Sequence, residues 1–443
     1  MIRRMTARTL GLFSLAGLIL LSGCSGGGSS DPAPVSTTSA VPPPSTPPAQ
    51  PPPVAPQPDM LTATNQGLLR GKASGQGQQL IFSHPNLHRE QLFISQDLVY
   101  YPRYNTPPFT FSADADVWSV RTDGTQDHAV LNSGLDEFVV GAKGPFAMVQ
   151  VNTYSEVALE LIDYVSLRAG QPLARITLPV PFIGFDFMTE THGYFSESLH
   201  ISSVNLDGSG LLPLVTVPLP TTTDSHSIVS PSVMVGAALL FSEQDRIMGQ
   251  FTSLHSVPVS GGAVTALDDG HHHHVYAAHV GDRVVSQICQ VDPVSFRAGP
   301  CDVQSVLADG SGLVVLAAEP ANEVVQGVTT DQVIIRRNLA GNDHLIAVPG
   351  TGGPERLLMT VTDSEFVDLI VGDLIIVRRP SGTWSLELNG TLTKIGTVAG
   401  DSGFIAIGNA VCLNKGTAVW CMPLDGSGQA VKIADTGRVV GVL

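Results

Sequence analysis

A run of acidic and histidine side chains is the most unusual chemical feature of this sequence. Asp268 and Asp269 precede Gly270, and four consecutive histidines follow at positions 271–274. Alternate side chains of an extended strand share a face, so His271 and His273 would point the same way. With Asp269 they offer the nitrogen and oxygen ligands that bind Zn²⁺ or Ni²⁺. The sequence therefore predicts a candidate metal site at His271, His273 and Asp269, with a solvated loop as the alternative.

Two other motifs resemble functional strings without their partners. Gly400-Asp401-Ser402-Gly403 matches the nucleophile string of serine peptidases, but no histidine motif of that family accompanies it. Acidic turns such as Asp207-Gly208-Ser209-Gly210 suggest calcium, yet a calcium loop needs several oxygen ligands and each turn has one carboxylate. We interpret these turns as structural, and we predict no catalytic residue and no cofactor.

Four cysteines form two local pairs, apart from Cys24. Cys289 and Cys301 flank one short segment, and Cys412 and Cys421 flank another. In a hairpin centred between residues 416 and 417, positions 412 and 421 face each other. Locally paired cysteines in an exported protein are typical of disulfides, and neither pair has the Cys-x-x-Cys spacing of a metal site. We therefore predict the disulfides Cys289–Cys301 and Cys412–Cys421.

A strand that runs into a glycine turn recurs along the chain. Asp-Gly and Asn-Gly are favoured in tight hairpin turns because these turns need positive φ. The spacing of 36 to 54 residues between turns is typical of propeller blades. The turn glycines lie near positions 124, 170, 208, 262, 310, 352, 390 and 426.

Each turn follows one or two further strand-like runs, and a first strand such as Glu137–Gly141 or Glu365–Leu369 also recurs. Four strands per unit predict an all-β fold, a β-propeller of eight blades. Seven blades is the alternative, because residues 270–319 are irregular, and an array of β-sandwiches is the third. The unit 98–131 has no evident inner strand, so we expect the C-terminal strand 438–443 to complete it and close the ring.

These turns resemble those of a known family. The best match is the run Asp116-Val117-Trp118-Ser119-Val120-Arg121-Thr122-Asp123-Gly124-Thr125, which is similar to the Asp-Gly-Ser blades of TolB-like bacterial propellers. The resemblance covers residues 91–443. It implies the propeller fold and does not imply a ligand.

The first 24 residues predict export and lipidation. Arg3, Arg4 and Arg8 precede an apolar stretch, Leu10–Leu21, that is short for a membrane span. Leu21-Ser22-Gly23-Cys24 resembles the bacterial lipobox, which implies that Cys24 carries the lipid; an ordinary secretory signal is the alternative. The sorting rule of enterobacterial lipoproteins implies that Ser25 directs the protein to the outer membrane, at its periplasmic face or at the cell surface.

Composition divides the rest of the chain. Residues 25–60 are rich in Pro, Gly and Ser and predict a disordered linker. Residues 61–90 precede the first clear strand, and their role is left open. The propeller is predicted over residues 91–443.

Charge limits the classes of partner. Without its three N-terminal arginines the chain keeps 20 basic residues against 39 acidic ones, a net charge of −19. This balance argues against nucleic acid, which needs a basic surface. We expect a monomeric, membrane-anchored envelope lipoprotein that binds or scaffolds a protein, peptide or glycan partner. The alternative is an envelope hydrolase or lyase with its active site at the mouth of the propeller channel.

Overall fold

The computed structural model contains only strands, turns and irregular segments, with no helix, among the residues that it describes. Accordingly, it offers no helical segment with the length and apolarity to cross a membrane in this part of the chain. The predicted lipidation site Cys24 and most of the predicted linker lie outside the described residues. These are 58–84, 92–104, 115–154, 160–177, 184–197, 199–216, 227–245, 252–268, 273–291, 298–318, 322–339, 342–362, 364–399 and 402–442.

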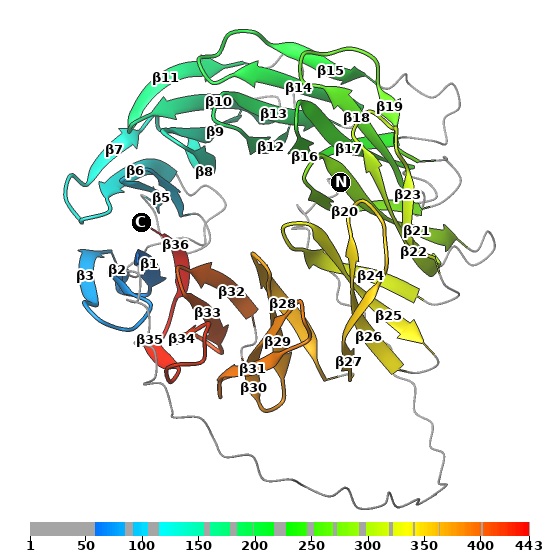
Figure 1. Ribbon diagram of the computed structural model, residues 1–443. Coiled ribbons are helices and arrows are strands. Elements are labelled where there is room, and N and C mark those ends of the chain that lie inside the picture. The colour runs from blue at the N-terminus through cyan, green and yellow to red at the C-terminus, as the bar shows by residue number, and fades with distance from the viewer. Residues whose placement is uncertain are drawn as a thin grey trace, which may run out of the picture. The chain divides into compact units, whose positions relative to one another are not determined.

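Thirty-six strands form nine four-stranded antiparallel sheets, the blades of a β-propeller (Figure 1). We number the blades along the chain and give the innermost strand first. Blades 1 to 3 are β36 (Arg438–Val442), β1 (Asp59–Thr64), β2 (Gly67–Lys72), β3 (Gln79–Ser83); β4 (Phe93–Ser95), β5 (Leu98–Tyr104), β6 (Ala115–Arg121), β7 (His128–Leu131); and β8 (Asp136–Lys143), β9 (Phe146–Tyr154), β10 (Glu160–Arg168), β11 (Gln171–Ile176).

Blades 4 to 6 are β12 (Gly184–Met188), β13 (His192–Glu197), β14 (His200–Asn205), β15 (Leu212–Thr216); β16 (Ser227–Val235), β17 (Ala238–Asp245), β18 (Thr252–Pro258), β19 (Thr265–Ala266); and β20 (His273–Val280), β21 (Arg283–Val291), β22 (Ala298–Leu307), β23 (Val314–Ala317). Blades 7 to 9 are β24 (Asn322–Val328), β25 (Gln332–Leu339), β26 (Asn342–Pro349), β27 (Arg356–Val361); β28 (Phe366–Val371), β29 (Leu374–Arg379), β30 (Gly382–Glu387), β31 (Leu392–Gly396); and β32 (Ser402–Ile407), β33 (Ala410–Lys415), β34 (Ala418–Pro423), β35 (Val431–Ala434).

The propeller has nine blades, so the predictions of eight and of seven are wrong while the all-β propeller class is correct. The additional blade comes from the segment 61–90, for which the sequence predicts no strand, together with Asp59 and Met60 at the end of the predicted linker. Within blade 1 these residues form β1, β2 and β3. The irregular region 270–319, which suggested seven blades, holds a complete blade 6.

The C-terminal strand closes the ring, as predicted, but it completes a different blade. β36 pairs with β1, with Met60 opposite Val442 and Thr62 opposite Val439. Figure 1 shows β36 in red next to β1 in blue. The unit 98–131 already has an inner strand, β4, which is only three residues long and too short for its pattern to be recognised.

The two faces of the propeller differ in their connections. In each blade the inner strand begins, and the second strand ends, at the same face of the propeller, which we call the entry face. We call the opposite face the turn face. The connections at the turn face all lie within the described residues and have two to seven residues. At the entry face, the connections after β3, β5 and β15 have nine or ten residues. Long connections on a rigid scaffold are where binding residues concentrate, so the entry face is the candidate binding face.

The repeated glycine turns join the third strand of a blade to its fourth. In four turns the aspartate accepts a hydrogen bond from the amide of the residue two positions later; the Ser209 amide, for example, donates to Asp207 at 2.9 Å. The Ser209 hydroxyl also donates to Asp207 at 2.6 Å, and these bonds hold the pKa of Asp207 below its ordinary value. The carboxylates are therefore occupied by their own turns, as the structural interpretation predicts.

The glycine of each turn also packs against the preceding blade. A Cβ on Gly124 of blade 2 would lie 2.0 Å from the carbonyl oxygen of Ile81 in blade 1, and φ there is +85°. Gly75 of blade 1 packs in the same way against Val431 of blade 9, which continues the arrangement across the closure. The turns are thus joints between blades. The apolar core likewise lies between blades, as where Leu61 and Leu68 of blade 1 cluster with Val99 and Val120 of blade 2.

Candidate functional site

Three exposed apolar side chains occupy one register position in three consecutive inner strands. Each inner strand from blade 3 to blade 8 carries one extra residue, a β-bulge, relative to its partner. Val275, Val324 and Phe366 each lie two residues before this bulge in blades 6, 7 and 8, with exposed fractions of 40%, 36% and 44%. We call these three residues the apolar arc. Single exposed apolar residues are ordinary, but a row of them near the entry face is a candidate contact surface.

The residue before each member of the arc is polar and buried. Glu323 is fully buried, and its Oε1 accepts a hydrogen bond from Nε of Arg337 at 2.7 Å. Arg337 also forms a two-point contact with Glu355, at 2.7 and 2.6 Å, which raises the pKa of Arg337 despite its burial. Ion pairing therefore offsets the free-energy cost of burying the charges of Glu323 and Arg337, and the pair links β24 to β25.

Blade 8 repeats this pairing. Glu365 pairs with Arg379 and accepts the amide of Thr362 at 2.8 Å. Burial alone would raise the pKa of Glu365, but these two partners outweigh it and the pKa lies below its usual value. In blade 6 the corresponding residue is His274, which is 2% exposed. Glu323 and Glu365 are thus structural.

The bulge of blade 8 holds an acid with an unusual environment. Asp368 is the extra residue of β28, and its side chain is 10% exposed. Arg378 Nη2 lies 3.2 Å from Asp368 Oδ1, and the same guanidinium lies 5.0 Å from the centre of the Phe366 ring. Burial raises the pKa of Asp368 to about 6, and the nearby Arg378 charge limits the rise. Phe366, Asp368 and Arg378 therefore form one cluster at the blade 8 end of the apolar arc.

Blade 4 has an aspartate at the same bulge position. Asp186 accepts a hydrogen bond from the Ser196 hydroxyl at 3.0 Å. Nearby groups that displace water raise the pKa of Asp186 to about 7, although the accessible surface of the residue places it among the exposed residues. Both bulge aspartates can hold a proton near neutral pH, but they belong to different blades and their hydrogen bonds and ion pairs do not connect them.

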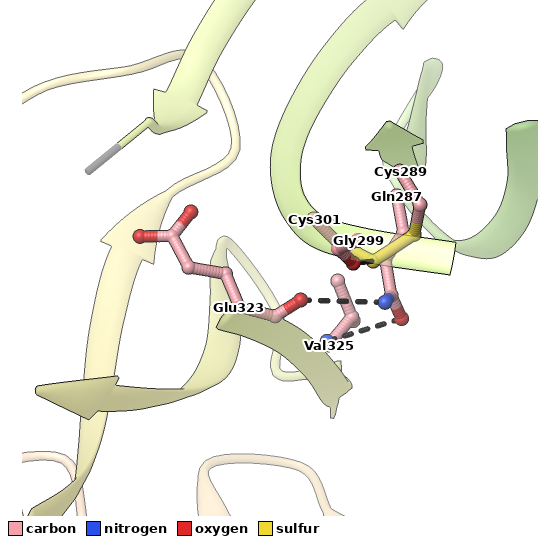
Figure 2. Close-up of a disulfide and its surroundings, with 6 residues drawn as sticks. All are labelled: Gln287, Cys289, Gly299, Cys301, Glu323 and Val325. Atoms are coloured by element: carbon pink, nitrogen blue, oxygen red, sulfur yellow. Dashed lines mark hydrogen bonds between the residues drawn. A yellow bond between two sulfur atoms is a disulfide. The ribbon is translucent and has the colours of Figure 1, made fainter. Parts of the chain in front are cut away.

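The predicted disulfide Cys289–Cys301 is confirmed and braces the blade next to the arc. It joins β21 to β22, where the two cysteines pair directly. Figure 2 shows that Gln287 on β21 reaches the inner strand of blade 7. Its amide nitrogen donates to the Glu323 carbonyl at 3.4 Å, and its oxygen accepts the Val325 amide at 3.3 Å. The Glu323 carboxylate points away from the disulfide in this view.

The second disulfide, Cys412–Cys421, is also confirmed. It joins directly paired residues of the hairpin β33–β34, as the spacing predicts. Both cysteines are fully buried in blade 9. These disulfides support the fold and leave no thiol among the four cysteines for chemistry.

The predicted metal ligands Asp269 and His271 lie outside the described residues, while the backbone of His273 begins β20. His273 and His274 thus belong to the inner strand of blade 6, and the metal site stays a prediction. Within the described part of the chain no three His, Cys, Asp or Glu side chains are grouped to hold a metal ion. Ser402 of the peptidase-like string is the first residue of β32, and its neighbours Gly400 and Asp401 lie outside the described residues.

Comparison with known proteins gives structural likeness only. No protein-family model matches the chain, and no curated protein matches it significantly. Similar solved structures include a prolyl endopeptidase, with 14% identity and a TM-score of 0.41 over 69% of this chain and 47% of that one. Our chain thus spans about half the length of that enzyme.

Two further structures are the β-propeller domain of the Trilobed protease from Pyrococcus furiosus and TolB from Acinetobacter baumannii. The first shares 8% identity over 79% of this chain and 98% of that chain, with a TM-score of 0.37. TolB, the protein whose blades the Asp-Gly-Ser turns resemble, shares 14% identity over 58% of this chain and 61% of that chain, with a TM-score of 0.27. The propeller assignment rests on the strand pairing of the chain itself.

Proposed function

We propose that this protein is a binding module of the bacterial envelope whose entry face holds an apolar segment of a protein or peptide partner. The observation that carries the proposal is the apolar arc of Val275, Val324 and Phe366, which three consecutive blades present at one register position. Glu323 and Glu365 precede two members of the arc, and each carboxylate is already paired with an arginine. They therefore favour a binding role over a catalytic one. In this proposal the lipid on Cys24 and the linker hold the module at the outer membrane.

Photo-crosslinking from the arc tests this proposal. The photoreactive amino acid p-benzoylphenylalanine replaces Phe366 in cells that express the full chain, and adducts are identified by mass spectrometry. Leu357 on the outer strand β27 is the matched control, because it is 56% exposed but belongs to a different surface. We expect a discrete adduct from position 366 that is absent from 357 and is lost when Val324→Asp is added. Equal adducts from both positions, or no loss with Val324→Asp, would overturn the proposal.

A second candidate function, an envelope hydrolase or lyase, is favoured by the two bulge aspartates. Asp186 and Asp368 have pKa values raised to about 7 and about 6, the range in which a carboxyl group serves as a general acid. Release of soluble fragments from envelope polymers measures this activity. Release that falls in both Asp186→Asn and Asp368→Asn would support it, and release that is absent in the unaltered protein would exclude it for the polymers tested.

A further inference from the structure

A cavity of about 450 Å³ lies between blades 5 and 6 at the turn face. Small and apolar residues form most of its wall, including Ala238 and Pro258 of blade 5 and Ala308 of blade 6. The Ser256 hydroxyl joins the two blades at this point, because it donates to the Ala308 carbonyl at 2.5 Å. The volume suits a side chain of a partner or a small ligand.

Two aspartates also line this cavity. Asp282 lies in the turn between β20 and β21, and Asp309 precedes the glycine of the turn between β22 and β23. Hydrogen bonds from Ser311 hold the pKa of Asp309 below its ordinary value, so its carboxylate is ionised at neutral pH. The described residues of the lining include no lysine, arginine or histidine. The cavity therefore carries negative charge that its own lining does not neutralise.

Blade 9 shows that these two turn positions lie within contact distance. Asn409 and Asp425 are the counterparts of Asp282 and Asp309, and the Asn409 amide donates to the Asp425 carboxylate at 3.4 Å. In blade 6 a second carboxylate takes the place of the amide. Two like charges at neighbouring positions repel each other, and a cation held between them would be stabilised by both.

Blade 2 shows how the fold can supply such a cation from within. Of the other described turns at this face, only those of blade 2 have an aspartate at both positions, Asp97 and Asp123. There Arg121, two residues before Asp123, forms an ion pair with Asp97. The corresponding residue of blade 6 is Leu307. Blade 6 therefore has the two carboxylates of blade 2 without the arginine that accompanies them.

Arg283, the basic residue next in sequence to Asp282, is directed to the other side of the blade. Its Nε donates to the Ser305 hydroxyl at 3.1 Å, and its guanidinium also donates to the Gly312 carbonyl. The Ser305 hydroxyl in turn donates to the Gly350 carbonyl of blade 7 at 2.7 Å. Arg283 thus lies on the blade 7 side, whereas the cavity lies on the blade 5 side.

The apolar wall and the carboxylates together indicate the chemistry of the occupant. A lysine side chain can pack its methylene groups on an apolar wall while its ammonium group stays at the solvated rim. A metal ion would make no use of the wall, and it needs more oxygen ligands than two carboxylates supply. An apolar side chain would make no use of the carboxylates.

We propose that this cavity binds the side chain of a lysine from a protein or peptide partner. The methylene groups pack against Ala238, Pro258 and Ala308, and the ammonium group lies between Asp282 and Asp309. The net charge of −16 would also attract a basic partner to the chain. The cavity lies at the face opposite the entry face and includes no residue of the apolar arc, so either proposal can fail without the other.

Saturation-transfer difference NMR of the full chain tests the site with small probes. The lysine probe is Nα-acetyl-lysine methylamide, and its Nε-acetylated form keeps the aliphatic chain but carries no charge. We expect saturable binding of the lysine probe that weakens as NaCl is raised, because both aspartates are exposed. The neutral probe should bind at least about threefold more weakly.

Two variants each remove one carboxylate while keeping the turn. Asp282→Asn reproduces the asparagine of blade 9, and Asp309→Asn reproduces the Asn389-Gly390 turn of blade 8, which has the same backbone hydrogen bonds. Each should weaken binding of the lysine probe about threefold to tenfold, as expected for one exposed charge pair. Asp207→Asn, the same change in the equivalent turn of blade 4, is the matched control and should leave binding unchanged.

Several outcomes would overturn the proposal. Equal binding of the neutral and lysine probes would indicate a purely apolar site. Unchanged binding in both Asp282→Asn and Asp309→Asn, or no saturable binding at all, would show that the two carboxylates do not hold an ammonium group. Displacement of the lysine probe by an equimolar amount of calcium ions would assign the carboxylates to a metal site instead.

Discussion

Asp368 shows how one register irregularity changes the chemistry of a residue. A β-bulge adds this residue to the inner strand of blade 8, and its carboxylate lies largely buried beside Arg378. Burial of a carboxylate favours its protonated form, whereas the arginine favours the ionised form. Burial is the larger effect here, because the pKa is raised to about 6.

The pH dependence of stability tests this environment. Because the pKa of Asp368 is higher in the folded state than its ordinary value near 4, ionisation opposes folding. Its full contribution to stability is present below about pH 4 and is lost as the pH rises to about 6. Asp368→Asn cannot ionise, so the wild-type protein should lose at most about 3 kcal/mol relative to the variant between pH 4 and 7.

Thermal and urea unfolding of both proteins at several pH values measure this difference. Wild type and Asp368→Asn share all other titrating groups. The contributions of those groups therefore cancel when one curve of unfolding free energy against pH is subtracted from the other. Asp97→Asn is a suitable control, because Asp97 pairs with Arg121 at an exposed position. A difference between wild type and Asp368→Asn that stays constant from pH 4 to 7 would contradict the raised pKa.

The residue scale is also where sequence reasoning was least complete. The spacing of Cys412 and Cys421 around a candidate turn was sufficient to predict their disulfide, because the register of a short hairpin follows from its turn. Phe366 and Asp368 lay in a predicted inner strand, but their contact with Arg378 depends on the bulge. The sequence carries no direct sign of that extra residue.

At the scale of the element, the repeated turn connects neighbouring blades as well as two strands. Its backbone hydrogen bonds recur, as in the Gly124 amide bond to the Arg121 carbonyl at 2.8 Å and the Gly75 amide bond to the Lys72 carbonyl at 2.9 Å. Serines of the third strand add a further link. Ser305 Oγ donates to the Gly350 carbonyl in the turn of the next blade at 2.7 Å.

Eight of the nine turns could be predicted from their glycines, and the ninth could not. The turn at Gly75 adopts the same positive φ, +78°, with a serine before the glycine, but it lies in the segment 61–90, where no strand pattern was clear. The aspartate of an Asp-Gly turn adds a side-chain hydrogen bond and can be recognised in the sequence. The backbone of the turn adopts the same geometry without it. The number of blades was therefore underestimated by one.

Substitution of turn glycines separates the two roles of the turn. Gly124→Ala in the repeated turn and Gly372→Ala in the short turn between β28 and β29 both place alanine at positive φ, which costs about 1 kcal/mol. The Cβ at position 372 meets no heavy atom within 4 Å, whereas that at 124 would approach the Ile81 carbonyl oxygen of the preceding blade. We expect Gly124→Ala to lower the unfolding temperature several times more than Gly372→Ala. Similar unfolding temperatures for the two variants would show that the contact between blades contributes little.

At the scale of the whole molecule, the fold depends on one short strand pairing. β36 supplies the inner strand of blade 1 from the far end of the chain, and the pairing with β1 closes the ring of nine blades. Closure removes two strand edges that would otherwise remain unpaired. The sequence predicted this closure because the chain ends in an isolated inner-strand pattern. It could not identify the partner, because residues 59–83 lack the Asp-Gly signal.

A disulfide across the closure tests whether the ends of the ring limit its stability. Thr62 and Val439 pair directly, and the buried Thr62 hydroxyl makes no hydrogen bond within the described residues, so Thr62→Cys removes none. Because the new bridge would close a loop of nearly the whole propeller, the chain-entropy model gives a gain of up to about 6 kcal/mol. We expect oxidised Thr62→Cys/Val439→Cys to unfold at a higher temperature than wild type, with the reduced form and Thr62→Cys alone close to wild type. Thiol titration reports whether the bridge forms. Persistent free thiols would contradict the register of β1 and β36, and a bridge without any gain would show that unfolding begins elsewhere in the ring.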